Sequence, residues 1–509
     1  MVDSTEVLVV GAGPTGLTLA CGLRAHGVSV RVLDGAQGPA ATSRANILHA
    51  RGVEVLDRLG ALGDLPQQSV TALRITVKLG ERTISQVRFG DVGLGTARPA
   101  LLASQATIEA RLRDRLAELG GQVEWDTPVT AVTQDADGAT ATLGDGQAVR
   151  AGWVVGCDGA HSTVRKVAGI GFPGAPVADS WLLADVHIDW PGSDRAGTVV
   201  WLHRDGVIGA LPMREVGGAE DLWRLMTYLP GAAPGQLGEA EILDRFRELL
   251  PHRTGMTGIR IRDAAWASVF RIHRRLAETY RSGRILLAGD AAHIHSPLGG
   301  QGMLTGIGDA ENLAWKLALV ASGRAEQALL ETYQAERRPL ATEVLKRTTA
   351  NTRLQTSDHA LVRFLRERIM SPVVNLPPVQ RWATALAAQL WVSYRRGPLA
   401  GPGNRFGARP RPGDRVPDLS CRRAGNATRL HAELGDHWAV LGSGTAAAAP
   451  AAAARHLLGD RVHDLVCAEV PAGQVWLVRP DAHLAWRGDP GSGGLRRWLD
   501  TALRHGRAG

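Results

Sequence analysis

The stretch Glu6-Val7-Leu8-Val9-Val10-Gly11-Ala12-Gly13-Pro14-Thr15-Gly16 joins a short apolar run to a glycine-rich turn. Residues 15–26 then have a helical pattern, and residues 28–34 form a second strand, so the segment predicts a βαβ unit. Glycines in such a turn let the backbone approach a diphosphate, whose charge the N-terminus of the helix stabilises. Asp34 follows Gly16 by 18 residues, close to the roughly 20-residue spacing at which an acid meets an adenosine ribose. A turn without a ligand is the alternative for an isolated match.

The periodicity of the remaining chain predicts an α/β fold built on a doubly wound sheet. Helices are expected at residues 46–63, 105–119, 309–322 and 328–396, and strands at 70–90, 123–156 and 284–288. Residues 178–275 alternate in polarity, which predicts an antiparallel second layer. A separate α/β module starts near residue 409, after a Pro/Gly-rich linker. Within it, the alanine-rich run 446–454 is expected to be a loop or a frayed helix start because Pro450 interrupts it.

Two further motifs narrow the prediction. The first is Gly156-Cys157-Asp158-Gly159-Ala160-His161-Ser162-Thr163-Val164-Arg165, which closes a β-run and opens a helix. The second is Ile285-Leu286-Leu287-Ala288-Gly289-Asp290-Ala291-Ala292-His293, followed by Pro297-Leu298-Gly299-Gly300-Gln301-Gly302-Met303.

In this order and at these separations, the three motifs resemble those of the class A flavoprotein aromatic hydroxylases, which include para-hydroxybenzoate hydroxylase and the aromatic polyketide hydroxylases. The resemblance covers essentially the whole chain, since Phe270 to Asp290, Asp309 to Ala318 and Val475 to Arg487 also match. It implies a Rossmann-type FAD-binding domain (residues 1–175 and 276–395, with a helical extension), to whose substrate region residues 70–100 contribute. It also implies an antiparallel-sheet substrate domain (176–275) and a thioredoxin-like C-terminal domain (409–509) without a redox CxxC.

The resemblance also implies which residues contact the cofactor. They are Gly11, Gly13, Pro14, Thr15 and Gly16 at the pyrophosphate, Asp34 at the ribose, Arg44 and Gln105 at the phosphate and ribityl parts, Asp158 and Arg165 near FAD and the nicotinamide, Gly289 and Asp290 at the ribityl chain, and Pro297, Gly300, Gly302, Met303 and Leu304 beside the isoalloxazine. A helix beginning near Gly302 would direct free N–H groups at the flavin pyrimidine ring, which is anionic when reduced. Arg44 could instead be a surface residue.

The chain departs from the family at three positions. Leu304 stands where the family usually has Asn, and Gly308 where it usually has Gln. The loss of an amide beside the pyrimidine ring bears on the flavin potential and on FAD affinity. Asp34 is one methylene shorter than the family's usual Glu.

The substrate pocket is expected between the antiparallel sheet and the flavin, since such sites form at layer junctions. Its candidate wall residues are Phe89, Trp201, Leu211, Met213, Met226, Tyr228 and Phe270. Each could instead be an ordinary core residue. No Ser-His-Asp or paired-carboxylate pattern points to a catalytic base, so the catalytic residues stay unknown.

Composition restricts the partners and the compartment. The 509 residues have a net charge of +8, 44% hydrophobic residues and four scattered cysteines. No disulfide framework, zinc site, export signal or membrane helix is suggested, which favours the cytoplasm. The charge excess concentrates in two arginine sets, one at positions 271, 274, 275, 281 and 284 and one at 395, 396, 405, 409, 411 and 415. Neither set has interleaved aromatics, which argues against nucleic acid, and the second is expected to be a solvated face.

The resemblance implies an FAD-dependent monooxygenase, an oxidoreductase that uses NADPH or NADH as a transient reductant and O2 through a flavin C4a-hydroperoxide. Its expected substrate is an aromatic, polycyclic polyketide-type molecule of antibiotic biosynthesis, and the chain is expected to be a monomer or homodimer. Baeyer–Villiger oxidation or epoxidation on the same scaffold stays open, as does a non-catalytic FAD-binding protein.

Overall fold

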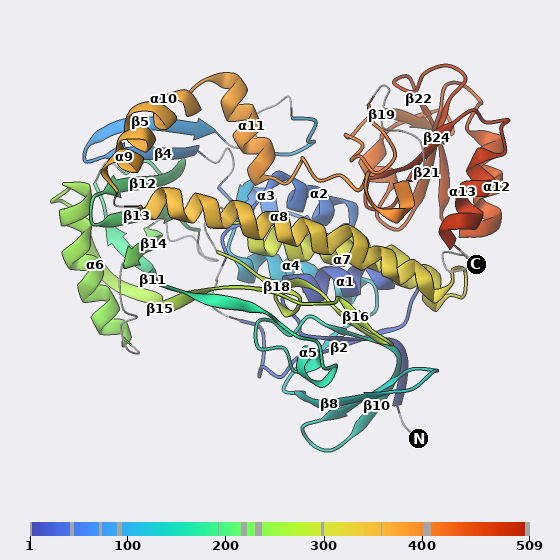
Figure 1. Cartoon of the computed structure of the whole chain (residues 1–509), viewed down its shortest axis with the longest axis horizontal. Helices are drawn as coiled ribbons and strands as arrows, with labels where there is room; N and C mark the ends of the chain where they lie inside the picture. The colour runs from blue at the N-terminus through green and yellow to red at the C-terminus, as the bar shows by residue number, and fades with distance from the viewer. Residues whose placement is uncertain are drawn as a thin grey trace.

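A mixed eight-stranded sheet, here called the central sheet, contains the first strand of the computed structural model, which describes residues 3–40, 45–70, 74–88, 94–191, 193–214, 221–229, 237–296, 300–357, 359–400 and 409–503 (Figure 1). Its parallel strands are β17 (Ile285–Leu287), β10 (Ala148–Gly156), β1 (Asp3–Val10), β2 (Val30–Leu33) and β7 (Val123–Glu124). The antiparallel strands β16 (Arg281–Ser282), β9 (Ala139–Leu143) and β8 (Val129–Gln134) complete it. Strand β1 ends in four buried apolar residues, as expected of a strand covered on both faces.

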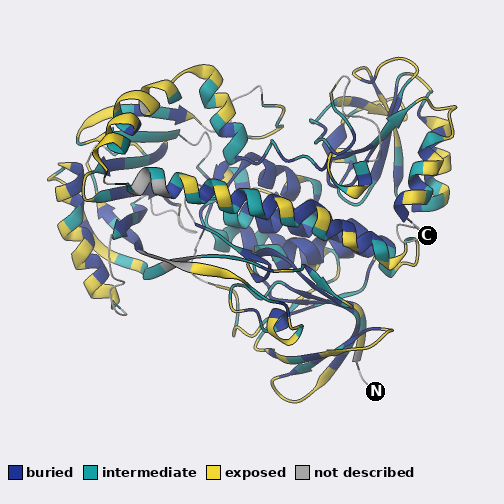
Figure 2. Ribbon diagram, in the orientation of Figure 1, coloured by how far each residue is buried: buried dark blue, intermediate teal, exposed yellow. Residues whose placement is uncertain are grey.

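Helices α1 (Pro14–Ala25), α4 (Gln105–Glu118) and α7 (Gln301–Ala321) lie together, and α5 (Thr163–Val167) contacts β10. Figure 2 shows α7 buried along much of its length. Where one helix was expected at residues 46–63, the chain forms β3 (Ile47–Leu48) and α2 (Ala50–Arg58), and the short helix α3 (Leu65–Gln68) follows. Ile47 and Leu48 pair with β6 (Leu101–Leu102), so strand pairing overrides the helical pattern there.

The second sheet has eight strands. Their order is β18 (His293–Ile294), β15 (Arg260–Leu276), β11 (Gly174–Asp189), β14 (Leu222–Leu229), β13 (Gly206–Pro212), β12 (Gly197–His203), β4 (Arg74–Leu79) and β5 (Arg82–Arg88). The strand pairs within residues 178–275 are antiparallel, as expected, and the sheet is extended by β4, which pairs with β12 in parallel.

One face of this sheet is covered by α6 (Glu239–Thr254), which the sequence analysis did not predict (Figure 1). Ile242, Phe246 and Leu250 of α6 recur at four-residue intervals and pack against the sheet. That spacing was readable in the sequence as a helical face.

A long helix, α8 (Glu331–Thr356), crosses the molecule between the second sheet and the C-terminal part (Figure 1). It is followed by α9 (Ala360–Phe364), a π-helix (Leu365–Met370), α10 (Ser371–Val374) and α11 (Pro377–Ala387). Single 3-10 turns lie at Gly289–Ala291, Gln327–Leu330, Pro398–Ala400 and Leu430–Glu433. No helix in the described part of the chain is both long and apolar enough to cross a membrane.

The C-terminal part is a mixed six-stranded sheet. Its order is β20 (Asn426–Arg429), β19 (Ser420–Arg423), β22 (Val462–Cys467), β21 (Trp438–Gly442), β23 (Val475–Val478) and β24 (Leu484–Gly488), with α12 (Ala448–Leu458) and α13 (Gly494–Leu503) packed on it. The expectation of a loop or a frayed helix start at 446–454 is therefore wrong, because most of this run lies in α12. Alanine favours helix, and Pro450 falls in the first turn, where its missing N–H costs no hydrogen bond.

Buried contacts fasten this module to helices α7, α8 and α2. Trp315 of α7 packs edge-on against Trp438, with ring centroids 5.1 Å apart. Arg479 Nη1 donates to Glu336 Oε1 of α8 at 2.7 Å, and both side chains are almost fully buried. Arg415, expected on a solvated face, instead has a side chain that is only 8% exposed and is paired with Glu54 of α2.

Candidate active site

The three sequence motifs meet because they leave adjacent parallel strands at the same edge. Val10 of β1 lies opposite Gly156 of β10, and Gly156 lies opposite Leu287 of β17. Each strand is followed directly by its motif. Ligands of open α/β sheets bind beyond the carboxyl ends of the strands, so this edge is the candidate cofactor site.

Glycine is required in the first motif for two different reasons. Gly11 has φ +107°, and a Cβ there would lie 2.4 Å from the carbonyl oxygen of Cys157. A Cβ on Gly16 would lie 1.9 Å from the carbonyl oxygen of Gly11. Both glycines therefore let the chain pack against itself.

Gly13 differs, because a Cβ there would meet no described heavy atom within 4 Å. It caps α1, and the described residues provide no side-chain hydrogen bond at this cap. Free N–H groups of a 12-residue helix thus face open space. This arrangement fits the diphosphate of FAD, which would fill the space and accept those hydrogen bonds.

Asp34 follows β2 and holds the turn. Its Oδ2 accepts from the Ala12 amide at 2.7 Å and its Oδ1 from the Ala36 amide at 2.8 Å. The side chain is half-buried, so its oxygens keep lone pairs for ribose hydroxyls. Although Asp34 is shorter than the family's usual Glu, it thus stabilises the backbone of the first motif directly, through its hydrogen bond from Ala12.

Thr15 joins the first motif to the third. Gly289 has φ +62°, and a Cβ there would lie 2.6 Å from Thr15 Oγ1. A Cβ on Gly306 of α7 would lie 2.2 Å from the same oxygen. Gly306 was not singled out in the sequence, although a glycine inside an otherwise strong helical pattern is a signal of close packing.

Asp309 is the main polar residue that the sequence analysis missed. Its carboxylate accepts from the Gly289 amide at 3.2 Å, from His293 Nε2 at 2.6 Å and from Arg337 Nε at 2.7 Å. Burial alone would raise the pKa of Asp309, but Arg337 and His293 outweigh it and hold the pKa below its usual value. A charged residue within the apolar period of α7 was the available signal.

Asp158 and Arg165 are engaged within the protein. Asp158 accepts from Ser162 Oγ at 2.5 Å and from the Val164 amide at 3.1 Å, which stabilises the start of α5. Arg165 is buried and donates to the carbonyl oxygens of Ala160 and Ala291, both at 2.9 Å. It therefore ties the second motif to the third. Its role as a direct cofactor contact stays a prediction.

Gln105 opens α4. Its Nε2 donates to Glu109 at 2.8 Å, and its Oε1 accepts from the Ala45 amide. Asp290, in the third motif, has an exposed side chain. Arg44, Pro297 and Phe89 lie outside the described residues.

Helix α7 begins at Gln301, close to the predicted start. Gly300 caps it with φ +62°, and the nearest atoms to a Cβ there belong to Ile47 and His49. The nearest to a Cβ on Gly302 belong to His295, 3.7 Å away. Burial lowers the pKa of His295 to about 4, so this ring is neutral at pH 7.

Gly308 and Leu304, the two departures from the family, serve packing. A Cβ on Gly308 would lie 2.9 Å from Arg337 Nη2, so glycine leaves room for the guanidinium that holds Asp309. Leu304 is buried 3.4 Å from the position of a Cβ on Gly52 of α2, and Met303 packs against the central core.

Two candidate wall residues lie beside the cofactor edge. Leu211 and Met226 cluster with Leu102 and Ile47. Ile47 also provides the atom nearest to a Cβ placed on Gly300. This apolar group of four residues, here called the junction patch, therefore joins the second sheet to the start of α7.

Three other candidates lie on the same side of the sheet. Met213 lines a small cleft with Leu102 and Ser104. Tyr228 and Phe270 cluster with Trp181 next to Met226.

The expectation that Trp201 lines the substrate pocket is wrong. It is 1% exposed and packs with Trp223 and with Phe246 of α6, on the opposite face of the sheet. Because side chains alternate along a strand, the strand β12 directs Leu202 rather than Trp201 toward the cluster of Tyr228 and Phe270.

The comparisons with known proteins agree with this geometry. A family model described as "FAD binding domain" matches residues 4–348, and one described as "Aromatic-ring hydroxylase, C-terminal" matches residues 409–505. The chain belongs to this FAD-binding family of flavoproteins. It is an FAD-dependent monooxygenase, and the predicted family, fold class and FAD cofactor are confirmed.

Similar proteins cover nearly the whole chain. The rifampicin monooxygenase of Streptomyces venezuelae is 34% identical over 490 residues, which cover 95% of this chain and 96% of the relative. The 12-dehydrotetracycline 5-monooxygenase/anhydrotetracycline 6-monooxygenase of Streptomyces rimosus is 36% identical over 524 residues, with 97% and 98% covered. A ternary complex of aklavinone-11 hydroxylase with FAD and aklavinone has a TM-score of 0.81 at 26% identity, covering 99% of this chain and 100% of that one.

Proposed function

We propose that this monooxygenase uses NADPH or NADH and O2 to hydroxylate a polycyclic aromatic molecule of polyketide type. The junction patch carries the proposal, because it places an apolar surface of the second sheet beside the start of α7. The names of the relatives support the substrate class, since they include 12-dehydrotetracycline, anhydrotetracycline and rifampicin. The four cysteines are free thiols, which fits a reducing compartment, and we propose a cytoplasmic monomer or homodimer.

The chain's own residues would divide the work. The turn at Gly13 and the N-terminus of α1 would hold the diphosphate, and Asp34 the ribose. FAD, when bound, supplies the transfer of electrons from the nicotinamide and the activation of O2. Gly300 and Gly302 would let the backbone approach the ring, and free N–H groups at the start of α7 would stabilise negative charge on it.

The junction patch would hold the substrate by apolar contact and exclude water. Its members Leu211, Met226, Leu102 and Ile47 carry no ionisable group. The reactivity of the substrate would therefore come from its own phenolic ring, and the protein would contribute orientation.

The test is turnover under labelled oxygen. FAD-loaded protein, NADPH or NADH and ¹⁸O2 are mixed with a panel of tetracyclic phenols and with single-ring phenols as controls. We expect one labelled oxygen in a hydroxylated tetracyclic product. Incorporation into a ring-expanded ester or an epoxide would favour the alternative oxygenation reactions. Consumption of the nicotinamide with release of peroxide alone would contradict the substrate class.

A further inference from the structure

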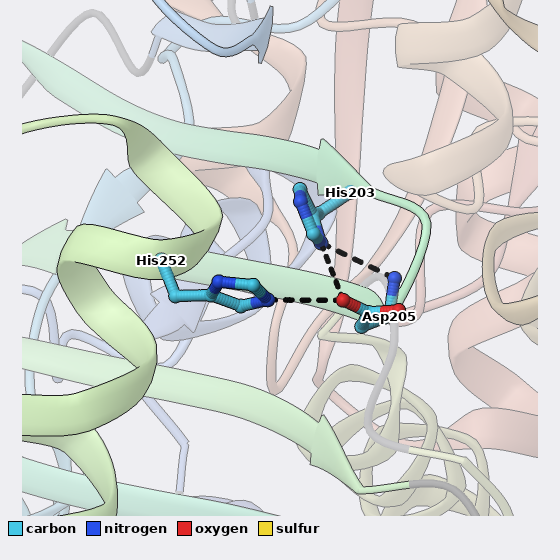
Figure 3. Close-up of side chains that lie close together, drawn as sticks. All are labelled: His203, Asp205 and His252. Carbon is cyan, nitrogen blue, oxygen red and sulfur yellow. Dashed lines mark hydrogen bonds and ion pairs between the residues drawn. The ribbon is translucent and has the colours of Figure 1, made fainter.

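Three potential metal ligands meet on the outer side of the second sheet, away from the cofactor edge. His203 is the last residue of β12, Asp205 lies in the turn that leads to β13, and His252 lies in the last turn of α6 (Figure 3). Asp205 and His252 are 47 residues apart along the chain. Figure 3 shows both imidazole rings directed at the carboxylate.

The distances suit a tetrahedral cation. Oδ2 of Asp205 lies 2.9 Å from His252 Nε2 and 3.5 Å from His203 Nδ1, and all three ligand atoms lie within 4.8 Å of one another. Zinc bonds of about 2.0–2.1 Å to nitrogen and 2.0–2.2 Å to oxygen place neighbouring ligands about 3.3–3.4 Å apart in a tetrahedron. These two separations bracket that distance, and the third, between the two histidine nitrogens, is no more than 4.8 Å, so rotations of the exposed side chains would bring the three ligands around one ion.

A buried arginine anchors the turn that carries the Asp205 carboxylate. Arg253 is 3% exposed, and its Nη2 donates to the Asp205 carbonyl oxygen at 2.7 Å. Its Nη1 donates to the Tyr228 carbonyl oxygen at 3.0 Å. Arg253 follows His252 in α6. Its hydrogen bond to Asp205 therefore fixes the position of the turn relative to His252. Such preorganisation favours ligand binding because less motion is lost.

His203 and the exposure of the cluster both permit binding of an ion. The backbone N–H of Asp205 donates to His203 Nδ1 at 3.2 Å, so this nitrogen is unprotonated, and zinc would take its one lone pair in place of that hydrogen bond. The side chains of His203, Asp205 and His252 are 24%, 50% and 52% exposed. An ion can therefore reach the three ligands, and water can complete its coordination.

We propose that His203 Nδ1, Asp205 Oδ2 and His252 Nε2 bind one Zn²⁺ ion that fastens the end of α6 to the turn between β12 and β13. Two imidazoles and one carboxylate are ligands of zinc, whereas Mg²⁺ and Ca²⁺ require oxygen. The ion would brace the layer behind Leu211 and Met226, whose strands lie in the same sheet. It is separate from the flavin and takes no part in the oxygenation.

The test uses full-length FAD-loaded protein, stripped with EDTA and desalted, and titrated with ZnSO4 by calorimetry. Wild-type protein is expected to bind one zinc ion, and binding should weaken by roughly tenfold or more in His252→Ala and in Asp205→Asn. Zinc should raise the melting temperature of wild type but not of His252→Ala. MgCl2 should produce neither effect.

His187→Ala is the matched control, because His187 forms a similar surface pair with Asp263 at 2.5 Å but lies outside the proposed ligand cluster. It should bind zinc as wild type does. Unchanged flavin absorbance and circular dichroism would show that each variant is folded. Equal zinc binding by wild type and His252→Ala, or none by wild type, would overturn the proposal and leave a hydrogen-bonded His–Asp–His cluster only.

Discussion

His293 Nε2 lies 2.6 Å from an oxygen of Asp309, and both side chains are almost fully buried. The same carboxylate also accepts from the Gly289 amide and from Arg337. One acid of α7 therefore positions the backbone of the third motif, although it lies about twenty residues further along the chain. Its effect on the cofactor is indirect, through the shape of that loop.

Replacing Asp309 with Asn should therefore remove the flavin. The amide nearly preserves the shape but leaves Arg337 as a buried cation with no carboxylate partner, which costs about 3–5 kcal/mol. We expect a lower melting temperature and a loss of FAD on gel filtration. Retention of FAD at wild-type occupancy would contradict this role.

Substitutions at two glycines should separate folding from cofactor binding. Gly13→Ala adds a methyl group to open space at φ −73°, a conformation that alanine adopts freely. Apo-protein stability should stay unchanged, while FAD affinity should fall at least about tenfold, or about 1.4 kcal/mol. FAD fluorescence titration measures this.

Gly16→Ala is the matched control, because its methyl group would overlap the Gly11 carbonyl oxygen and should lower the stability of the apo-protein itself. Equal FAD affinity of wild type and Gly13→Ala would show that the diphosphate does not lie at this turn.

Substitutions on opposite faces of the second sheet should have different effects. Trp201→Ala empties a position in the α6-facing core and should cost about 3–5 kcal/mol of stability. Its KM for substrate should stay near that of wild type. Met226→Ala, in the junction patch, should raise KM several-fold with a smaller change in melting temperature. The reverse pattern in steady-state kinetics and thermal melts would exchange the two assignments.

Stability should decline in mild acid through His483. Burial, together with Arg51 and Arg479, lowers the pKa of this ring from its usual 6.5 to about 4, although Asp481 opposes the shift. Because the folded pKa is depressed, the stabilisation is complete above pH 6.5 and is lost as pH falls toward 4. Melting temperatures between pH 7.5 and 4.5 measure the effect. In His483→Asn, which keeps a donor for the Asp481 carbonyl oxygen, the decline should be shallower; an identical pH profile would exclude His483 as its cause.

Glu336→Gln should weaken the attachment of the C-terminal module. Glu336 accepts from Arg479 and from Lys316, at 2.7 Å and 2.8 Å, and is fully buried. Removing its charge takes the carboxylate partner from the buried Lys316, while Arg479 keeps Asp481, and should cost about 3–5 kcal/mol. We expect faster proteolysis between residues 387 and 420. Glu118→Gln, which breaks an exposed pair with Arg115, should change stability by about 0.5 kcal/mol or less. Equal cleavage rates in the two variants would contradict the prediction.

Local patterns were sufficient for the central sheet and its glycine turn. The run from Glu6 to Gly16 specifies a strand, a tight turn and a helix, because each feature depends on neighbours within a few residues. The same holds for the start of α7 beside Gly302. The order and separation of the three motifs along the chain also predicted the family and its FAD cofactor, and the comparisons confirmed both.

Only the tertiary structure decided which polar and apolar side chains face the site. The sequence presents Asp309 as one charge in an apolar helix and Trp201 as one aromatic in a strand. Their partners Gly289, His293 and Phe246 come from other elements, so no local pattern contains the contact. The register of β12 within its sheet turned Trp201 away, and the convergence of β17, α7 and α8 gave Asp309 its role. Side-chain direction and burial depend on packing between distant segments, and that is where the sequence alone was insufficient.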